Sequence, residues 1–281
     1  MKENSELNNI CDIRKKAIIV GASADIGVAL CDNWGNSGWE IYGTYRTMSA
    51  DVERIKSKIS LMVNCDLGKK NSVDKACERL KQHAQDWDVL VLCPGLQDPI
   101  QLFHDCDFDE WAKSIEVNFI NQLRFVHNLL SSRRRVDGEP PTVLFFAGGG
   151  TNNATVRYSA YTASKIALIK MVELLAAEIT DVKFIIIGPG WVKTKIHNST
   201  LLARDKAGDN YQRTVDKLKS NECTPMDKVV ECCNILISGP SSLLTGRNFS
   251  VVFDKWGTDE LNSLLLKYPD MYKLRRYGNE L

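Results

Sequence analysis

Short apolar runs alternate with amphipathic helical stretches along most of this chain, and this alternation restricts the fold more than any other feature. We expect strands at residues 16–20, 40–45, 59–63, 88–93, 142–147, 182–187 and 248–253. Helical spacing separates them, most clearly over 108–131 and 159–179. Strands that alternate with helices form a parallel sheet covered on both faces. The sequence therefore predicts an α/β fold, a doubly wound parallel sheet in three αβα layers that forms a single domain.

A chain of 281 residues is long enough for one large α/β domain. We expect a mobile N-terminal arm at residues 1–14 and the main domain at 15–257. The polar, irregular segment at about 190–224 is expected to form short lid helices over a substrate. Residues 258–281 are expected to be a C-terminal extension with one helix and an aromatic, basic end.

Composition excludes several classes of protein. The formal charge of +1 gives no reason to expect a nucleic-acid or membrane partner. The apolar runs are too short to span a bilayer, and the first residues lack the apolar core of a signal peptide. Nine scattered cysteines without a C-x-x-C pair, and four histidines, indicate a reduced cytoplasmic protein without a metal site. The Cys232–Cys233 pair is expected to be buried.

The stretch 159–170 contains Tyr161 and Lys165, which are four residues apart in a run with helical spacing. That spacing places both side chains on one helix face. A neighbouring ammonium favours the phenolate, so we expect Lys165 to lower the pKa of Tyr161 and make it an acid/base group for a carbonyl or alcohol. The alternative is a solvated lysine beside a tyrosine that only packs.

The turn at residues 21–27 lies between an expected strand and an expected helix, where a nucleotide-binding turn must lie. Gly21 permits a tight turn out of the strand, and Gly27 lets the helix pack close to the sheet. Backbone N–H groups at the helix start can hold a pyrophosphate. A purely structural tight turn is the alternative.

These features together resemble the short-chain dehydrogenase/reductase family, which has a single Rossmann-type domain. The family's turn reads T-G-x-x-x-G-x-G, whereas this chain has Val20 first and Asp25 at the middle glycine. Aspartate tolerates left-handed backbone and is a good N-cap. Its carboxylate would nevertheless be unfavourable beside a phosphate unless it points away.

Further motifs extend the resemblance through residue 253. Tyr161 and Lys165 match Y-x-x-x-K, and residues 189–194 match P-G-x-V-x-T. The resemblance implies that Tyr161, Lys165 and Asn118 are catalytic, Asn118 by holding a relay water. It implies a binding site for the dinucleotide cofactor, made of Gly21, Ser23, Asp25, Ile26, Gly27, Arg46, Asp66, Leu67, Cys93, Gly95, Tyr161, Lys165, Pro189, Val192 and Thr194.

The chain departs from the family at two further points. Leu92, Cys93 and Pro94 stand where the family has N-N-A, which removes amides that brace the centre of the sheet. The family's catalytic serine falls at Ala147 or Gly148, and neither carries a hydroxyl. Thr151 can supply the hydroxyl, the substrate can carry a polar group there, or catalysis has been lost. A loop residue without a role is the alternative for Thr151.

The end of the second strand indicates the cofactor. NAD sites usually place an acidic residue there, but this strand is followed by Arg46, which can pair with a 2′-phosphate. Ser23 can add a hydrogen bond. We therefore expect NADP(H) rather than NAD(H), although an exposed arginine after a strand also occurs without a ligand.

The lid segment carries many lysines and arginines, which fit either an anionic substrate or a solvated surface. His197 is expected at the surface. Trp191 either flanks the nicotinamide or anchors the lid, and the aromatic tail either closes over the site or packs on a neighbouring subunit.

The sequence thus predicts an NADP(H)-dependent oxidoreductase that interconverts a carbonyl and a secondary alcohol. The resemblance suggests a homodimer or homotetramer. The alternatives are a catalytically weak NADP(H)-binding scaffold protein and, less favoured, a sugar-nucleotide epimerase or dehydratase.

Overall fold

A computed structural model of the protein describes residues 14–135 and 138–277. Nearly all of the expected N-terminal arm lies outside these ranges. Seven strands form one parallel sheet in the order β3-β2-β1-β4-β5-β6-β7. They are β1 (Lys16–Val20), β2 (Glu40–Tyr45), β3 (Leu61–Asn64), β4 (Val89–Leu92), β5 (Thr142–Phe146), β6 (Lys183–Gly188) and β7 (Arg247–Ser250). The predicted doubly wound sheet is confirmed.

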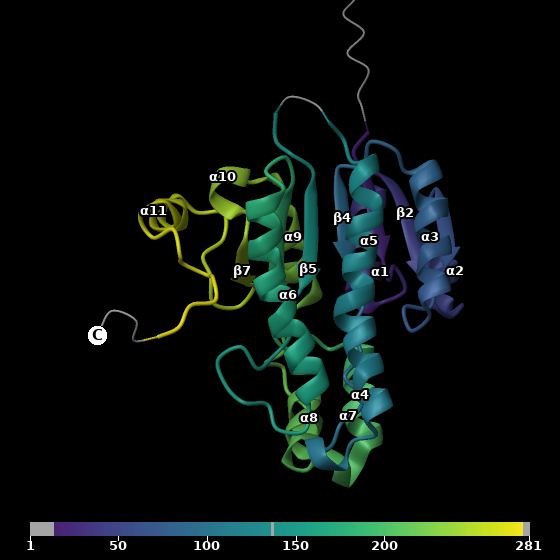
Figure 1. The fold of residues 1–281 in the computed structure, drawn as a ribbon, viewed down its shortest axis with the longest axis vertical. Coiled ribbons are helices and arrows are strands. Elements are labelled where there is room, and N and C mark those ends of the chain that lie inside the picture. Colours follow the sequence, from purple (N-terminus) through teal and green to yellow (C-terminus); the bar gives the residue numbers. More distant parts are fainter. Residues whose placement is uncertain (1–13, 136–137, 278–281) are drawn as a thin grey trace, which may run out of the picture.

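Helices cover both faces of this sheet (Figure 1). The helices are α1 (Asp25–Asn36), α2 (Ala50–Lys56), α3 (Lys70–His83), α4 (Phe108–Ile115), α5 (Asn121–Leu129), α6 (Ser159–Glu178), α7 (Asn198–Ala203), α8 (Asp209–Lys219), α9 (Met226–Ser238), α10 (Ser241–Leu244) and α11 (Asp259–Lys267). One face carries α3, α5 and α6, and the other carries α1 and α9. Helices α7 and α8 lie beyond the carboxyl ends of the strands, where the lid was expected.

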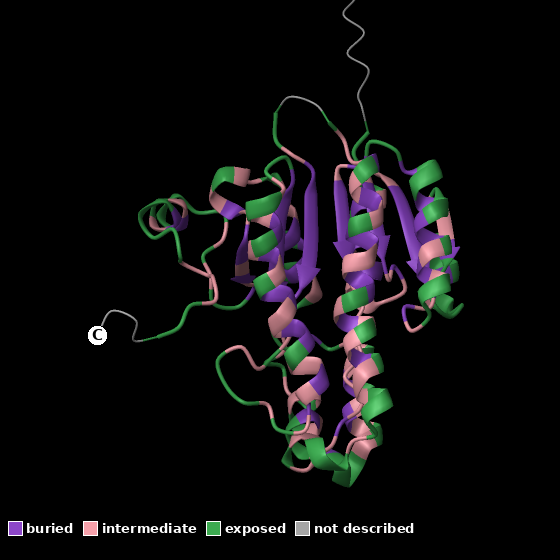
Figure 2. Ribbon diagram, viewed as in Figure 1, coloured by how far each residue is buried: buried purple, intermediate pink, exposed green. Residues whose placement is uncertain are grey.

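Alternation of side chains along the strands divides the core into two halves. Ile18 and Val20 of β1 point into the layer under α3, α5 and α6. Ala17 and Ile19 point into the opposite layer under α1 and α9. Figure 2 shows that the central strands are mostly buried, and every residue of β4 and β5 is buried. Burial on both faces explains why these strands are continuous apolar runs rather than alternating ones.

The long helix expected at 108–131 is present but contains a π-helical turn at Glu116–Ile120 between α4 and α5. The turn includes Asn118, whose side chain is fully buried. A π-turn shifts the following residues around the helix axis and is frequent at functional sites. Its position marks Asn118 as the residue that the widened turn directs inward.

Several element boundaries differ from the sequence expectation. Helices α2 and α10 were not expected, although Ser49 caps α2 by accepting a hydrogen bond from Val52 N–H. The third strand begins at Leu61 because Ile59 N–H is bonded back to Lys56. The last strand ends at Ser250, because its hydroxyl accepts hydrogen bonds from the N–H groups of Val252 and Phe253 and so begins a turn.

The C-terminal residues pack on this chain's own sheet. Leu261 and Leu265 of α11 are buried in the core, and Trp256 and Tyr272 pack against the same cluster. Tyr272 also accepts a backbone hydrogen bond from Asn248 of the edge strand β7. Trp256 and Tyr272 thus pack on the core of this chain, and the expected closure of the tail over the site or packing on a second subunit stays a prediction.

Cys232 and Cys233 are buried as expected, and burial raises the pKa of Cys232 to about 12. Within residues 14–135 and 138–277, no helix combines the length and the apolar character needed to cross a membrane.

Candidate active site

The predicted site residues gather at the carboxyl ends of the central strands. Strands β1 and β4 are neighbours, although the chain runs outward from β1 to β2 and β3 before it returns to β4. In open parallel sheets, ligands bind at the carboxyl edge of such a crossover point. The turn at Gly21, the segment after β4 and the loop after β5 all meet at this edge.

Lys165 lies at the centre of the site, with 2% of its surface exposed. Its ammonium donates a hydrogen bond to Phe146 O at 2.9 Å and lies 3.5 Å from Pro94 O. Helix α6 is therefore tied to the ends of both β5 and β4. Burial disfavours the charged form and lowers the pKa of Lys165 to about 8.

Tyr161 lies on the same face of α6, as the spacing predicts, and its ring centre is 5.9 Å from the Lys165 ammonium. The expected effect of Lys165 on its pKa is wrong for this structure. Burial raises the pKa of Tyr161 to about 12, because desolvation disfavours the phenolate. The tyrosine is thus held protonated, as a proton donor rather than a standing base.

Gly148 explains how Tyr161 is placed. A Cβ atom built on Gly148 would lie 2.6 Å from Tyr161 Oη and 2.7 Å from its Cε1. The phenol ring therefore rests directly on the Gly148 backbone, in the space that a serine side chain would fill. The structure links the absence of a side chain at 148 to the position of Tyr161. Thr151 is partly buried on the loop after β5, and its suggested hydroxyl role stays a prediction.

Asn118 braces the segment that follows β4. Its Oδ1 accepts a hydrogen bond from Leu96 N–H at 2.8 Å, and its Nδ2 donates to Leu96 O at 2.7 Å. The side chain is thus a positioning group, and its expected role in holding a relay water stays a prediction.

Two bracing residues escaped the sequence reasoning. Gln122 Nε2 donates to Pro94 O at 3.0 Å, and Ser114 Oγ donates to Leu96 O at 3.4 Å. With Asn118 they replace the bracing that the missing asparagines would give. Ser114, Asn118 and Gln122 follow one another at intervals of four residues, and this spacing along one helix face is the sequence signal that could have identified them.

The phosphate-binding turn has the geometry that its glycines predict. Gly21 has a φ of +75°, and a Cβ on Gly27 would lie 2.4 Å from Gly21 O. The N-cap of α1 is Ala24, which makes no side-chain cap, so the expectation that Asp25 caps the helix is wrong. Asp25 begins the helix, and its carboxylate turns toward the loop after β6.

That carboxylate is bonded to Lys195, just after the P-G-x-V-x-T segment. Asp25 Oδ2 accepts from Lys195 N–H at 2.7 Å, and Lys195 Nζ lies 3.4 Å from Asp25 Oδ1. The next residue, Ile196, reaches within 3.0 Å of where a Cβ on Gly95 would be. Residues 195 and 196 therefore close over the turn and over the segment after β4.

The remaining expected cofactor residues also lie along the carboxyl edge. Asp66 accepts a hydrogen bond from Gly68 N–H at 3.0 Å, and Leu67 O accepts one from Asn121 at 2.7 Å. Arg46 is exposed after β2. Ser23, Ile26, Cys93, Pro189 and Thr194 are partly buried, and Val192 is buried. Their contacts with a dinucleotide stay predictions.

The lid is anchored by stacked rings. Trp191 and His197 stack with centroids 4.4 Å apart, and His197 Nε2 lies 2.9 Å from Val192 O. His197 is 8% exposed, so its expected place at the surface is wrong, and burial lowers its pKa. The stack fits the anchoring role considered for Trp191, and its role beside the nicotinamide stays a prediction.

The lid also contacts Tyr161. Tyr161 packs against a small apolar cluster of Ile100, Tyr158 and Ala207. Tyr158 Oη is 2.7 Å from Thr200 Oγ1, which ties the start of α6 to α7. Any substrate of Tyr161 therefore meets a mixed apolar and hydroxyl-bearing wall.

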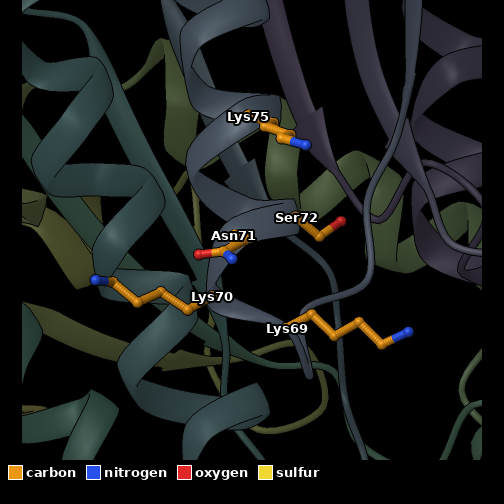
Figure 3. Close-up of a pocket in the computed structure, with 5 residues that line it drawn as sticks. All are labelled: Lys69, Lys70, Asn71, Ser72 and Lys75. Atoms are coloured by element: carbon orange, nitrogen blue, oxygen red, sulfur yellow. The ribbon is translucent and has the colours of Figure 1, made fainter.

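The surface also has two hollows. One of about 480 Å³, at the start of α3, is lined by Lys69, Lys70, Asn71, Ser72 and Lys75. In Figure 3 the side chains of Lys69 and Lys70 point in opposite directions, so they do not converge on one ligand. The other, of about 280 Å³, lies at the base of the lid between Val192 and Met226.

The sequence of this chain is similar to those of known proteins. Residues 15–205 match the family described as short chain dehydrogenase, and the chain belongs to that family. It is 22% identical over 249 residues to an NAD-dependent glycerol dehydrogenase of Listeria innocua, covering 86% of this chain and 93% of that protein. It is 21% identical to a 3-oxoacyl-[acyl-carrier-protein] reductase of Buchnera aphidicola, covering 85% and 96%.

Solved structures share the fold. A short chain dehydrogenase/reductase from Saccharomyces cerevisiae superposes with a TM-score of 0.72 at 21% identity, covering 88% of this chain and 98% of that one. An actinorhodin polyketide ketoreductase with NADPH gives 0.73 at 17% identity, covering 85% and 95%. The chain is thus a member of an oxidoreductase family that uses nicotinamide cofactors.

Adding a side chain at position 148 should displace Tyr161. We expect Gly148→Ser to lower the free energy of unfolding by about 1–3 kcal/mol, since it overpacks a filled space. Gly149→Ser is the matched control, because nothing lies within 4 Å of a Cβ there. Chemical denaturation measures both variants. Equal stability of the two would contradict the packing of Tyr161 on Gly148.

Lys165 should make stability depend on pH. Its folded pKa of about 8 lies below the ordinary 10.5, so between these values the unfolded chain binds the proton that the folded chain has lost. Lys165 should therefore add about 3 kcal/mol to the free energy of unfolding between pH 8 and 10.5. Urea denaturation measures this as a difference between the unaltered protein and Lys165→Met that grows across that range, and parallel curves would refute a buried lysine with a lowered pKa.

Proposed function

We propose that the protein is an NADP(H)-dependent oxidoreductase that interconverts a carbonyl compound and a secondary alcohol. The observation that carries the proposal is the pairing of a protonated Tyr161 with a buried Lys165 at the carboxyl edge, beside a glycine-bearing turn. Relatives of about one-fifth identity include a dehydrogenase of glycerol and a reductase of 3-oxoacyl chains, which supports this type of substrate pair.

Each residue has a chemical task in this proposal. When bound, the nicotinamide supplies or accepts the hydride. Tyr161 Oη donates a proton to the carbonyl oxygen, and in the reverse direction its phenolate takes that proton from the alcohol. With a pKa of about 12 it remains a stronger acid than water at ~15.7. Lys165 carries its charge at pH 7, because its pKa is about 8, and stabilises the phenolate formed in each turnover.

The site residues fit a dinucleotide at its phosphate end. Gly21 and Gly27 allow the tight turn that precedes α1, where backbone N–H groups would hold a pyrophosphate. Arg46 would pair with a 2′-phosphate, and no carboxylate follows β2 to bind a ribose hydroxyl instead. Val192, Thr194 and the backbone at Pro189 would orient the nicotinamide. Trp191 and Thr151 would border the substrate.

The proposal also includes the oligomeric state of the protein and its location in the cell. A homodimer or homotetramer through α4, α5 and α6 is supported by exposed apolar side chains, among them Phe108 of α4 at 62%, Ile120 of the π-helical turn at 43% and Leu174 of α6 at 44%. A cytoplasmic location is supported by thiols that are free at all eight cysteines of the described residues.

A catalytically weak dinucleotide-binding protein is the second candidate. The closure of residues 195 and 196 over the turn favours it, together with the lack of a hydroxyl at positions 147 and 148. The sugar-nucleotide epimerase or dehydratase is not favoured by any contact in the structure.

Tyr161→Phe tests the reaction. With NADPH and a panel of ketones and sugar-derived carbonyls, the unaltered protein should consume NADPH. The variant should lose at least about 10²-fold in rate, since it has lost its proton donor. Tyr211→Phe, on the same lid cluster, is the control. Turnover that survives in Tyr161→Phe would contradict the role of Tyr161, and dinucleotide binding without turnover would favour the second candidate.

Arg46→Ala tests the cofactor. Loss of a charge-assisted contact with a phosphate should weaken NADPH binding about 10- to 100-fold and leave NADH binding nearly unchanged. Arg79→Ala, an exposed arginine on α3, serves as the control. Isothermal titration of both cofactors decides, and an equal loss for NADH and NADPH would refute the assignment of Arg46.

A further inference from the structure

Lys195 connects the first turns of α1 and α2. Its backbone N–H and its ammonium both contact the Asp25 carboxylate, at 2.7 and 3.4 Å. The same ammonium lies 3.1 Å from Asp51 Oδ2 at the start of α2. One cation thus lies between two carboxylates at the mouth of the phosphate-binding turn, and its contact with Asp25 offsets the charge of that carboxylate.

Asp25 needs this neutralisation if an anion is to bind. It occupies the first turn of α1, where N–H groups and the helix dipole attract negative charge. A free carboxylate there would repel a pyrophosphate through a short distance. The carboxylate has instead turned to Lys195, and it occupies an anion position formed by one N–H and one ammonium.

We propose that Lys195 is a cofactor-binding residue, one that contacts the pyrophosphate of the dinucleotide and offsets the charge of Asp25. The inference rests on the proposed function, because it takes the dinucleotide to bind at this turn. The ammonium exchanges Asp51 for a phosphate oxygen while it remains beside Asp25. This exchange is easy, since the Lys195 side chain is 51% exposed and such exposed pairs are weak.

In this proposal, Lys195 compensates for Asp25, the residue that replaces the family's middle glycine. An aspartate in place of the family's glycine makes the turn more acidic, and a lysine on the facing loop restores the balance. The two residues are 170 positions apart in the chain, so only the fold brings them together. Position 195 then sets how tightly this chain binds its cofactor.

The test compares four variants of the full chain by isothermal titration with NADPH and with 2′-phospho-ADP-ribose, which keeps the pyrophosphate and the 2′-phosphate but lacks the nicotinamide. Lys195→Ala should weaken both ligands about tenfold or more, since it leaves Asp25 and Asp51 unpaired beside a phosphate. Asp25→Gly in the Lys195→Ala background should recover most of that loss. Lys195→Arg, which keeps the charge, should stay within about threefold of the unaltered protein.

Lys193→Ala is the matched control, because Lys193 is exposed two residues earlier on the same segment. If Lys195→Ala binds both ligands as tightly as Lys193→Ala, the role is overturned. It is also overturned if only NADPH weakens, because the contact would then be with the nicotinamide end. If the unaltered protein binds neither ligand, the proposed function itself fails, a result distinct from both.

Discussion

A buried ammonium holds the centre of this structure together. Lys165 reaches from α6 to Phe146 O at the end of β5 and to Pro94 O beyond β4, and it has almost no contact with solvent. A buried charge is tolerated only where polar groups surround it. The ends of the central strands are therefore arranged around Lys165, and the position of Tyr161 follows from the helix turn that separates the two residues.

The position of Tyr161 depends in turn on the absence of a side chain at Gly148. Its ring lies on the backbone of Gly148, where a Cβ would approach Oη to 2.6 Å. The absence of a serine there can be viewed as a loss of catalytic power, but the packing gives a second view. Without a serine side chain, the phenol of Tyr161 can lie against the backbone just after β5. A hydrogen-bond donor to an oxyanion must then come from the substrate, from the loop at Thr151 or from the backbone.

Much of the fold could be predicted from the sequence, because buried parallel strands are continuous apolar runs. Both β1 and β2 lie where the pattern placed them. The start of β3 could not be predicted, since a helix end and a strand start share the apolar residues near Ile59. The site residues on one helix, Tyr161 and Lys165, were also predictable from their spacing.

The contacts between distant segments could not be predicted. The turn of Asp25 toward Lys195 depends on how the loop after β6 folds back over α1. The burial of His197 depends on a stack with Trp191 that spacing alone does not indicate. The raised pKa of Tyr161 reverses the sequence expectation, because desolvation is a property of the packed site and not of a pair of residues.

The most direct measurement is a crystal structure of the protein with NADP⁺. The account predicts that the dinucleotide lies across the turn at Gly21–Gly27, with its nicotinamide ribose between Tyr161 Oη and Lys165 Nζ. It would be contradicted by a dinucleotide bound elsewhere, or by a Tyr161 hydroxyl that faces away from the nicotinamide.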